Sequence, residues 1–290
     1  MTKYSKPNII AEIGCNHKGD LDIAKELILL AKTSGSDVAK FQKRNSKELL
    51  PETQYNAPHP NPINSYGKTY GEHREFLEFS KEEHKELMEY CTSKDILYST
   101  SVWDVTSAKE ISDLKPHLIK VPSASNTHYE MLEILRDEYD GDVHVSFGMT
   151  TKQEQEKLVK FFEEKKQAKN KLIIYSCTSG YPVPFEDVCL LEILKIKEQF
   201  KDRVKDIGFS GHHLGISIDI AAYTLGVSWI ERHFTKDRTW KGTDHAASLE
   251  PAGFSKLTRD LKATYRALNY KNMEVLDIEK PQREKLKFSK

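Results

Sequence analysis

Cysteine is scarce in this chain. Only four of the 290 residues are cysteines, at positions 15, 91, 177 and 189, and none of them forms a CxxC motif. This pattern argues against a disulfide framework and against a zinc site made of thiolates. We therefore interpret all four as ordinary reduced thiols.

Long apolar runs are missing as well. The first residues, MTKYSKPNIIAEIG, lack the apolar stretch of a signal peptide. No later segment approaches the roughly 20 consecutive apolar residues that a membrane span needs. We therefore expect a cytoplasmic protein without a membrane partner.

Neither sign of charge predominates. The 44 Lys and Arg residues balance the 44 Asp and Glu residues, so no overall bias indicates a nucleic-acid partner. An anionic ligand would have to be held by a local cluster of residues. The chain also contains no GxGxxG and no GxxxxGK[ST] motif, which argues against nucleotide binding.

What the sequence does contain is a regular alternation of strand-like and helix-like segments. Amphipathic stretches such as 21–35, 81–95, 152–166 and 215–226 have apolar residues at the three- and four-residue spacing of helices. Between these and similar stretches lie short β-branched or apolar runs that are the strand candidates. These are NIIAEIG from 8, VAKFQK from 38, ILYSTSV from 96, LIKVPS from 118, DVHVSFG from 142, KLIIYSC from 171, DIGFSG from 206 and SWIERHF from 228.

Eight such units with right-handed crossovers fit a closed parallel barrel better than an open doubly wound sheet. A barrel of this kind routinely forms one domain of about 250 residues. We therefore predict the α/β class, with a single-domain (β/α)8 TIM barrel over residues 1–270 and a charged C-terminal tail over 271–290.

The connection after the second strand candidate is unusually long. Residues 44–80 are rich in Pro, Asn, Tyr and His, whereas an ordinary βα connection has about 2 to 6 residues. The aromatic content of this irregular stretch argues against disorder. We expect a lid or a substrate-binding loop.

Polar residues gather where the strand candidates end, which is where such barrels carry their reactive groups. Converging lysines and hydroxyls could hold a small, highly charged anion such as a phosphate ester with a carboxylate. Lys40 and Lys120 lie inside apolar runs, which favours a role in binding such an anion. The alternative is that both lysines simply reach solvent at the ends of their strands. The polar residues are Glu12, Asn16, His17, Lys40, Gln42, Lys43, Thr100, Lys120, Ser123, Ser146, Ser179, Tyr181, Ser210, His212, His213, Glu231, His233 and Asp244.

Histidines end the last two strand candidates. Adjacent strand residues point to opposite sides, so only one of His212 and His213 should face the barrel axis. That histidine and His233 could share a divalent ion through their imidazole nitrogens. Glu231 should face the same way as His233 and act as its partner. A hydrogen-bonded pair of polar barrel residues is the alternative, and spacing leaves both open.

Several of these residues lie in motifs that resemble the sialic acid (N-acetylneuraminate) synthases. The resemblance runs from about residue 8 to the end of the predicted barrel. SYGKTYGEH and Ser179 resemble the animal-type synthases, which use a 6-phosphorylated hexosamine. The motifs are IIAEIGCNHKG, VAKFQK, SYGKTYGEHREFLEFS, IKVPSAS, SFGMTT, SCTSGYPVPFEDV, GFSGHH and WIERHFTKDRTWKGTDHAASLEP.

This resemblance implies an enzyme that condenses phosphoenolpyruvate with N-acetylmannosamine, its 6-phosphate or a related hexose. With water, the products would be a nonulosonic (sialic) acid, or its 9-phosphate, and phosphate. The resemblance also implies a divalent ion on His212 and His233, with Mn²⁺ as the first expectation and Mg²⁺ or Co²⁺ as alternatives.

The resemblance further implies roles for individual residues. Glu12, Lys40 and Asp244 are the expected catalytic residues. Lys68, Tyr70 and His73 could form a second phosphate site. The expected phosphoenolpyruvate-binding residues are Lys40, Thr100, Lys120, Ser123, Ser146, Ser179 and Ser210, and the expected sugar-binding residues are Gln42, Lys68, Tyr70, Tyr181 and Asp244.

The chain departs from the family pattern at its C-terminal end. Family members usually continue into a small antifreeze-like domain that supplies an arginine to the acceptor sugar across a dimer. We expect no such domain here, because the sequence ends at Lys290. A separate chain, or the lid and tail, would then replace that contact, unless the acceptor has no N-acyl group. A homodimer is the assembly usual for such enzymes.

Three other functions compete with this one. A metal-dependent hydrolase on the same barrel would need further ligands, such as an HxH pair after the first strand, where this chain has EIGCNH. A 3-deoxy-ulosonate synthase with another aldose acceptor has closer chemistry but fits the motifs less well. A non-catalytic sugar-acid-binding barrel is disfavoured by the presence of both histidines and the lysines.

Overall fold

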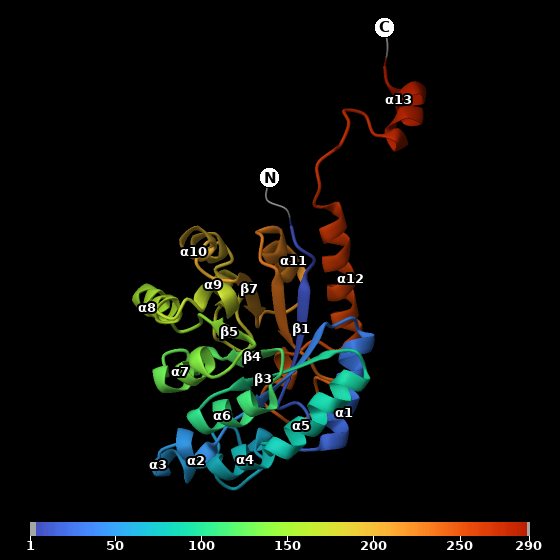
Figure 1. The fold of residues 1–290 in the computed structure, drawn as a ribbon. Helices are drawn as coiled ribbons and strands as arrows, with labels where there is room; N and C mark the ends of the chain where they lie inside the picture. Colours follow the sequence, from blue (N-terminus) through green and yellow to red (C-terminus); the bar gives the residue numbers. More distant parts are fainter. Residues whose placement is uncertain (1–3, 289–290) are drawn as a thin grey trace.

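The computed structural model describes residues 4–288. Eight parallel strands pair in chain order and close into a barrel, with helices arranged around it (Figure 1). The predicted (β/α)8 barrel is therefore confirmed. The strands are β1 Asn8–Gly14, β2 Val38–Lys43, β3 Leu97–Val102, β4 Leu118–Val121, β5 Asp142–Ser146, β6 Leu172–Cys177, β7 Asp206–Gly211 and β8 Trp229–His233.

Local signals start several of the helices. Asp20 caps α1 by accepting from two backbone N–H groups, and a capping box of Ser80 and Glu83 begins α5. Short apolar stripes on the helices then pack against the strands. The helices between strands and after the barrel are α1 Leu21–Thr33, α5 Lys81–Ser93, α6 Val105–Leu114, α7 Tyr129–Asp137, α8 Lys152–Glu163, α9 Ala168–Lys171, α10 Glu192–Phe200, α11 Ser217–Thr224 and α12 Pro251–Ala267.

The strands separate two apolar regions. The larger region lies between the strands and the helices, and a small cluster fills the inside of the barrel with Ile10, Val38, Leu118, Ile173 and Tyr175. Nearer the carboxyl ends of the strands, the residues that pair across neighbouring strands are polar instead. Glu12 pairs with Lys40 on β2 and with His233 on β8. The pairing therefore sets a polar layer above an apolar floor.

Segment 44–80 contains several short helices joined by irregular stretches. It contains α2 Ser46–Leu49, α3 Glu52–Tyr55, the 3-10 turn η1 Pro62–Asn64 and α4 Tyr70–Leu77. A capping box of Thr69 and Glu72 begins α4. Helices α2 to α4 lie together at one end of the barrel (Figure 1).

The C-terminal residues leave the barrel. After α12 the chain extends away and forms α13 (Lys280–Leu286) at the opposite end of the barrel from α2 to α4 (Figure 1). No helix among residues 4–288 combines the length and the apolar character that a membrane crossing requires.

A buried charged cluster ties β8 to the chain after β7. Arg232 is 1% exposed and donates to Asp219 Oδ2 at 2.5 Å, to the His213 carbonyl at 2.6 Å and to the Gly215 carbonyl at 2.8 Å. Because strand residues alternate, Arg232 lies behind the sheet while its neighbour His233 faces the barrel mouth. The cluster therefore fixes two strand ends from behind.

We predict that Asp219→Ala strongly destabilises the protein. The change leaves the Arg232 charge buried without its carboxylate, which typically costs about 3–5 kcal/mol of unfolding free energy. Denaturant unfolding would measure the loss. The control Asp260→Ala breaks an exposed pair with Arg259 and should leave the midpoint nearly unchanged. Equal effects of the two changes would contradict a structural role for the cluster.

Candidate active site

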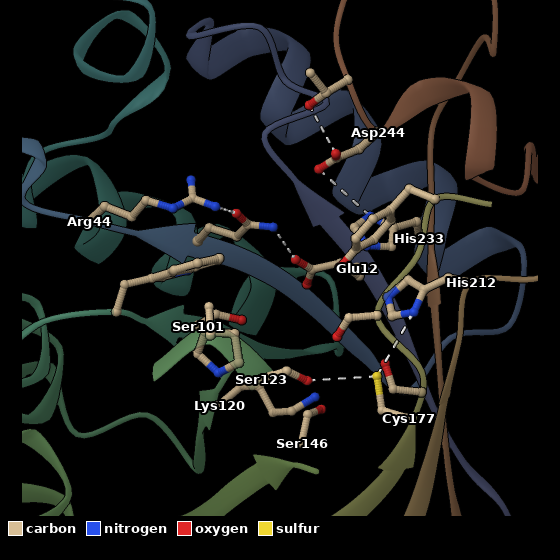
Figure 2. A pocket seen from close by; sticks show the side chains of 18 of the residues that line it. Glu12, Arg44, Ser101, Lys120, Ser123, Ser146, Cys177, His212, His233 and Asp244 are labelled. Atoms are coloured by element: carbon tan, nitrogen blue, oxygen red, sulfur yellow. Dashed lines mark hydrogen bonds and ion pairs between the residues drawn. The ribbon is translucent and has the colours of Figure 1, made fainter. Parts of the chain in front are cut away.

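A cavity of about 580 Å³ opens at the carboxyl ends of the strands. Its size suits a small-molecule ligand, and barrels of this architecture carry their reactive residues at this end. In Figure 2, His212 and His233 lie on one side, Arg44 lies on the other and Lys120 lies below. Every strand contributes to the lining, through Glu12, Lys40, Gln42, Ser101, Lys120, Ser146, Cys177, Ser210, Glu231 and His233.

Lys40 is held at the base of the cavity by three oxygen-bearing side chains. Its Nζ forms an ion pair with Glu12 and donates to Ser101 Oγ at 2.8 Å, and Glu231 Oε1 lies 3.8 Å away. Gln42 Nε2 donates to Glu12 Oε1 at 2.8 Å and so orients that carboxylate. Lys40 is only 2% exposed, so its charge depends on these partners.

Lys120 forms the second half of this base. Its Nζ donates to Glu231 Oε2 at 2.8 Å, and Ser210 Oγ donates to Glu231 Oε1 at 3.1 Å. Burial lowers the pKa of Lys120, against the opposing effect of Glu231. Burial alone would raise the pKa of Glu231, but Lys120 and then Lys40 hold it below its ordinary value. Glu231 therefore stays ionised and bridges the two lysines.

Hydroxyl groups form the wall next to the lysines. A Cβ at Gly148 would lie 2.5 Å from both Ser123 Oγ and Ser179 Oγ, so the glycine leaves room for these hydroxyls to converge. Asn126 Nδ2 donates to the Ser146 carbonyl at 2.8 Å and holds the adjoining loop. Hydroxyls can donate to the oxygens of an anion. The base and this wall together form an anion site.

Two histidines stand at the mouth, with ring centroids 5.4 Å apart. His212 Nδ1 lies 3.2 Å from the Thr178 carbonyl, so a proton on Nδ1 leaves Nε2 free as a ligand. Burial, and then nearby His233, lowers the pKa of His212 to about 3. The His212 ring is therefore neutral, as a metal ligand must be. Tyr181 packs edge-on against it, at 4.5 Å between centroids.

The donors at the mouth fit a divalent ion that keeps open coordination positions. His233 Nδ1 is buried without a hydrogen-bond partner among the described residues, and Asp244 Oδ2 lies 4.0 Å from it. Burial would raise the pKa of Asp244, but His233 and a hydrogen bond from Thr243 keep it lowered. Residues 4–288 contain no ready-made cluster of three or more His, Cys, Asp or Glu ligands. The chain thus offers two imidazoles, with the remaining positions open to water or substrate.

Two arginines also line the cavity, and Arg44 lies across it from the histidines (Figure 2). The Arg44 guanidinium stacks 4.1 Å from the Trp103 ring and pairs with Glu78 at 3.3 Å. Arg74, in α4, donates to the Tyr70 hydroxyl at 2.9 and 3.1 Å. Within the described part of the chain, no carboxylate lies at ion-pair distance from Arg74. Its free N–H groups could therefore bind a second anion.

The structure brings most of the predicted site residues into this one cavity. They are Glu12, Lys40, Gln42, Tyr70, Lys120, Ser123, Ser146, Ser179, Tyr181, Ser210, His212, His233 and Asp244. Two other predicted residues, Thr100 and Lys68, lie outside the lining. Thr100 faces away because its neighbour Ser101 faces the cavity, and Lys68 is exposed on the surface. His73, proposed for a second phosphate site, is buried outside the lining and accepts from the Tyr66 backbone N–H at 3.1 Å.

Sequence reasoning missed other lining residues. Ser101 could have been found from the alternation of side chains along β3. Arg44 directly follows β2, so its position at a strand end could have indicated a site residue. Arg74 lies in α4, and its orientation could not be predicted without recognising that helix. The missed residues of the mouth and wall include Arg44, His59, Asn61, Arg74, Ser101 and Trp103.

Comparison with known proteins identifies close relatives. The model of the NeuB family matches residues 27–273. Human N-acetylneuraminate-9-phosphate synthase is 39% identical over 284 residues, which cover 96% of this chain and 76% of the human protein. The N,N'-diacetyllegionaminic acid synthase of Campylobacter jejuni is 32% identical over 263 residues, covering 91% of this chain and 78% of that protein.

A solved structure agrees with these relatives. The crystal structure of the N-acetylneuraminic acid (sialic acid) synthetase of Leptospira borgpetersenii, in complex with citrate, superposes with a TM-score of 0.81 at 29% identity. The match covers 97% of this chain and 91% of that one. The resemblance to animal-type sialic acid synthases noted in the sequence motifs is confirmed. This chain belongs to the NeuB family.

Proposed function

We propose that this protein condenses phosphoenolpyruvate with an aldose to give a nonulosonic (sialic) acid and phosphate. The observation that carries the proposal is a single cavity with two buried lysines and a wall of hydroxyls at its base and two histidines at its mouth. Relatives named as sialic, legionaminic and pseudaminic acid synthases support the same reaction class.

The base of the cavity suits the donor. Phosphoenolpyruvate carries a phosphate and a carboxylate within a few atoms, and Lys40 and Lys120 lie close enough to share Glu231. Ser123 and Ser179 can donate to further oxygens. The incoming anion competes with the glutamates for the two ammonium groups. Such preorganised donors hold the substrate and stabilise charge that develops during reaction.

The mouth suits the acceptor aldehyde. His212 and His233 would hold a divalent ion, with Mn²⁺ as the first candidate and Mg²⁺ or Co²⁺ as alternatives. When bound, this ion supplies Lewis-acid polarisation of a carbonyl oxygen. Tyr181 and Asp244 line the same side of the cavity and can orient the hydroxyls of the sugar.

The reaction balances without any oxidant or reductant. C3 of phosphoenolpyruvate forms a bond to the aldehyde carbon of the sugar, and the aldehyde oxygen gains a proton. Water adds to C2 and supplies the new keto oxygen, and the bond between C2 and the phosphate oxygen breaks. Glu12, hydrogen-bonded to Gln42 beside Lys40, is placed to handle a proton from that water.

We further propose that the acceptor carries a phosphate at its C6 end. Arg74 supports this proposal because it lines the cavity and has donors that no carboxylate of the described residues uses. Lys68, the earlier candidate, is exposed and outside the cavity. A location in the cytoplasm and a homodimer remain predictions.

We predict turnover in a direct assay of donor and acceptor. Purified protein with Mn²⁺ and phosphoenolpyruvate should release phosphate and form an α-keto sugar acid with N-acetylmannosamine 6-phosphate, and less efficiently with the free sugar or mannose 6-phosphate. His212→Ala should abolish turnover and weaken Mn²⁺ binding, because one of two protein ligands is lost. No phosphate release with any acceptor would argue against a synthase and favour a non-catalytic barrel, whereas release that no acceptor stimulates would indicate a hydrolase.

We predict that Arg74→Met specifically weakens use of the phosphorylated acceptor. Loss of hydrogen bonds from a charged donor should raise the KM for N-acetylmannosamine 6-phosphate by about 10- to 100-fold. The KM for the free sugar should change little. Lys68→Met is the matched control in the same segment and should leave both values near wild type. A similar rise for both acceptors in Arg74→Met would contradict a phosphate contact.

A further inference from the structure

An aromatic ring lies against Lys120 inside the barrel. Tyr175, on β6, is fully buried and belongs to the apolar cluster of the barrel interior. The Lys120 Nζ lies 4.2 Å from the centroid of the Tyr175 ring. This distance is within the range in which an ammonium is attracted to the face of an aromatic ring. Lys120 thus has a carboxylate partner, Glu231, and an aromatic partner.

Neighbouring residues hold the Tyr175 ring in this place. The Tyr175 hydroxyl lies 2.7 Å from His144 Nδ1, and the His144 ring packs edge-on against Trp229 at 4.7 Å between centroids. Burial raises the pKa of Tyr175 and lowers the pKa of His144, so the hydrogen bond joins two neutral groups. A Cβ at Gly208 would lie 2.4 Å from Tyr175 Cε1, so only glycine leaves room for the ring.

This support matters because Lys120 has little help from water. Its side chain is 2% exposed, and burial opposes its charged form. When the donor anion binds to the Lys120 ammonium, the ion pair between Lys120 and Glu231 is weakened or lost. The ring face cannot be displaced in the same way, because it has no hydrogen bond with the ammonium to exchange. It therefore stabilises the charge in both the free and the liganded protein.

We propose that Tyr175 is a positioning residue for donor binding: its ring face holds the Lys120 ammonium charged and directed at the donor anion. The inference rests on the proposed function, because it takes phosphoenolpyruvate as that anion. Tyr175 itself does not line the cavity, so it acts only through Lys120. His144 and Gly208 serve the same purpose indirectly, the first by anchoring the ring and the second by leaving it space.

Packing alone is the competing explanation, and the chain contains a matched control for it. Tyr98, on β3, is buried to a similar degree, and its hydroxyl lies 2.7 Å from His84 Nδ1. This second tyrosine and histidine pair lies in the outer apolar region between strands and helices. Replacing Tyr98 removes the same kind of contacts without touching a lysine.

The test measures phosphoenolpyruvate binding by calorimetry, with KM and kcat in parallel, for the full-length protein. Tyr175→Met keeps an apolar side chain but removes the ring, and it should raise the Kd and KM for phosphoenolpyruvate about tenfold while kcat changes less than about twofold. Tyr175→Phe retains the ring face and should recover most of the affinity. Tyr98→Met should lower the melting temperature and leave the Kd unchanged.

Each outcome of this test is decisive. Wild-type affinity in Tyr175→Met, or equal losses in Tyr175→Met and Tyr175→Phe, would overturn the inference but leave the proposed function standing. Wild-type protein that fails to bind phosphoenolpyruvate would overturn both. If Tyr175→Met does not fold, Gly208→Ala is the second variant, because its Cβ would collide with the Tyr175 ring and displace it. That variant should also raise the Kd, and an unchanged value would again overturn the inference.

Discussion

The arrangement of the site depends on keeping two lysine charges inside a protein interior. Lys40 and Lys120 are each about 2% exposed, and an unpaired ammonium at such a place would cost several kcal/mol. Glu12 and Glu231 remove most of that cost, and the barrel register supplies them by setting Glu12 level with Lys40. The two ammonium groups are therefore charged, oriented and shielded from water before any ligand binds. This preorganisation favours strong binding of a small anion.

The rest of the barrel maintains this geometry from different directions. Apolar side chains fill the barrel beneath the lysines, and Tyr175 offers its ring face to Lys120. Behind the sheet, Arg232 binds the chain after β7 and so restrains the strand ends that carry His212 and His233. At the mouth, the helical segment 44–80 closes one wall. Most of the reactive groups thus lie on the strands or directly after them, while the wall opposite the histidines comes from a connection that can vary with the acceptor.

The sequence was sufficient to predict the barrel. The alternation of strand and helix patterns, and the polar residues at the ends of the strands, can be recognised without any knowledge of how the elements pack. Most site residues followed from the same rule. The two predicted residues that lie outside the lining do so for physical reasons. Ser99, Thr100 and Ser101 are all hydroxyl residues, so composition cannot say which one faces the cavity, whereas the alternation of side chains along β3 puts Thr100 and Ser101 on opposite faces. Arg74 lines the cavity and Lys68 does not. Which of the two faces the cavity depends on where α4 begins, and only the capping box at its start indicates that.

The most direct test of the central claim is a crystal structure of the protein with phosphoenolpyruvate, with anomalous data for Mn²⁺. The account predicts that the phosphate and carboxylate of the donor contact the ammonium groups of Lys40 and Lys120, and that the Mn²⁺ signal lies between His212 and His233. Phosphoenolpyruvate bound away from both lysines, with Glu12 and Glu231 still holding them as in the free protein, would contradict it.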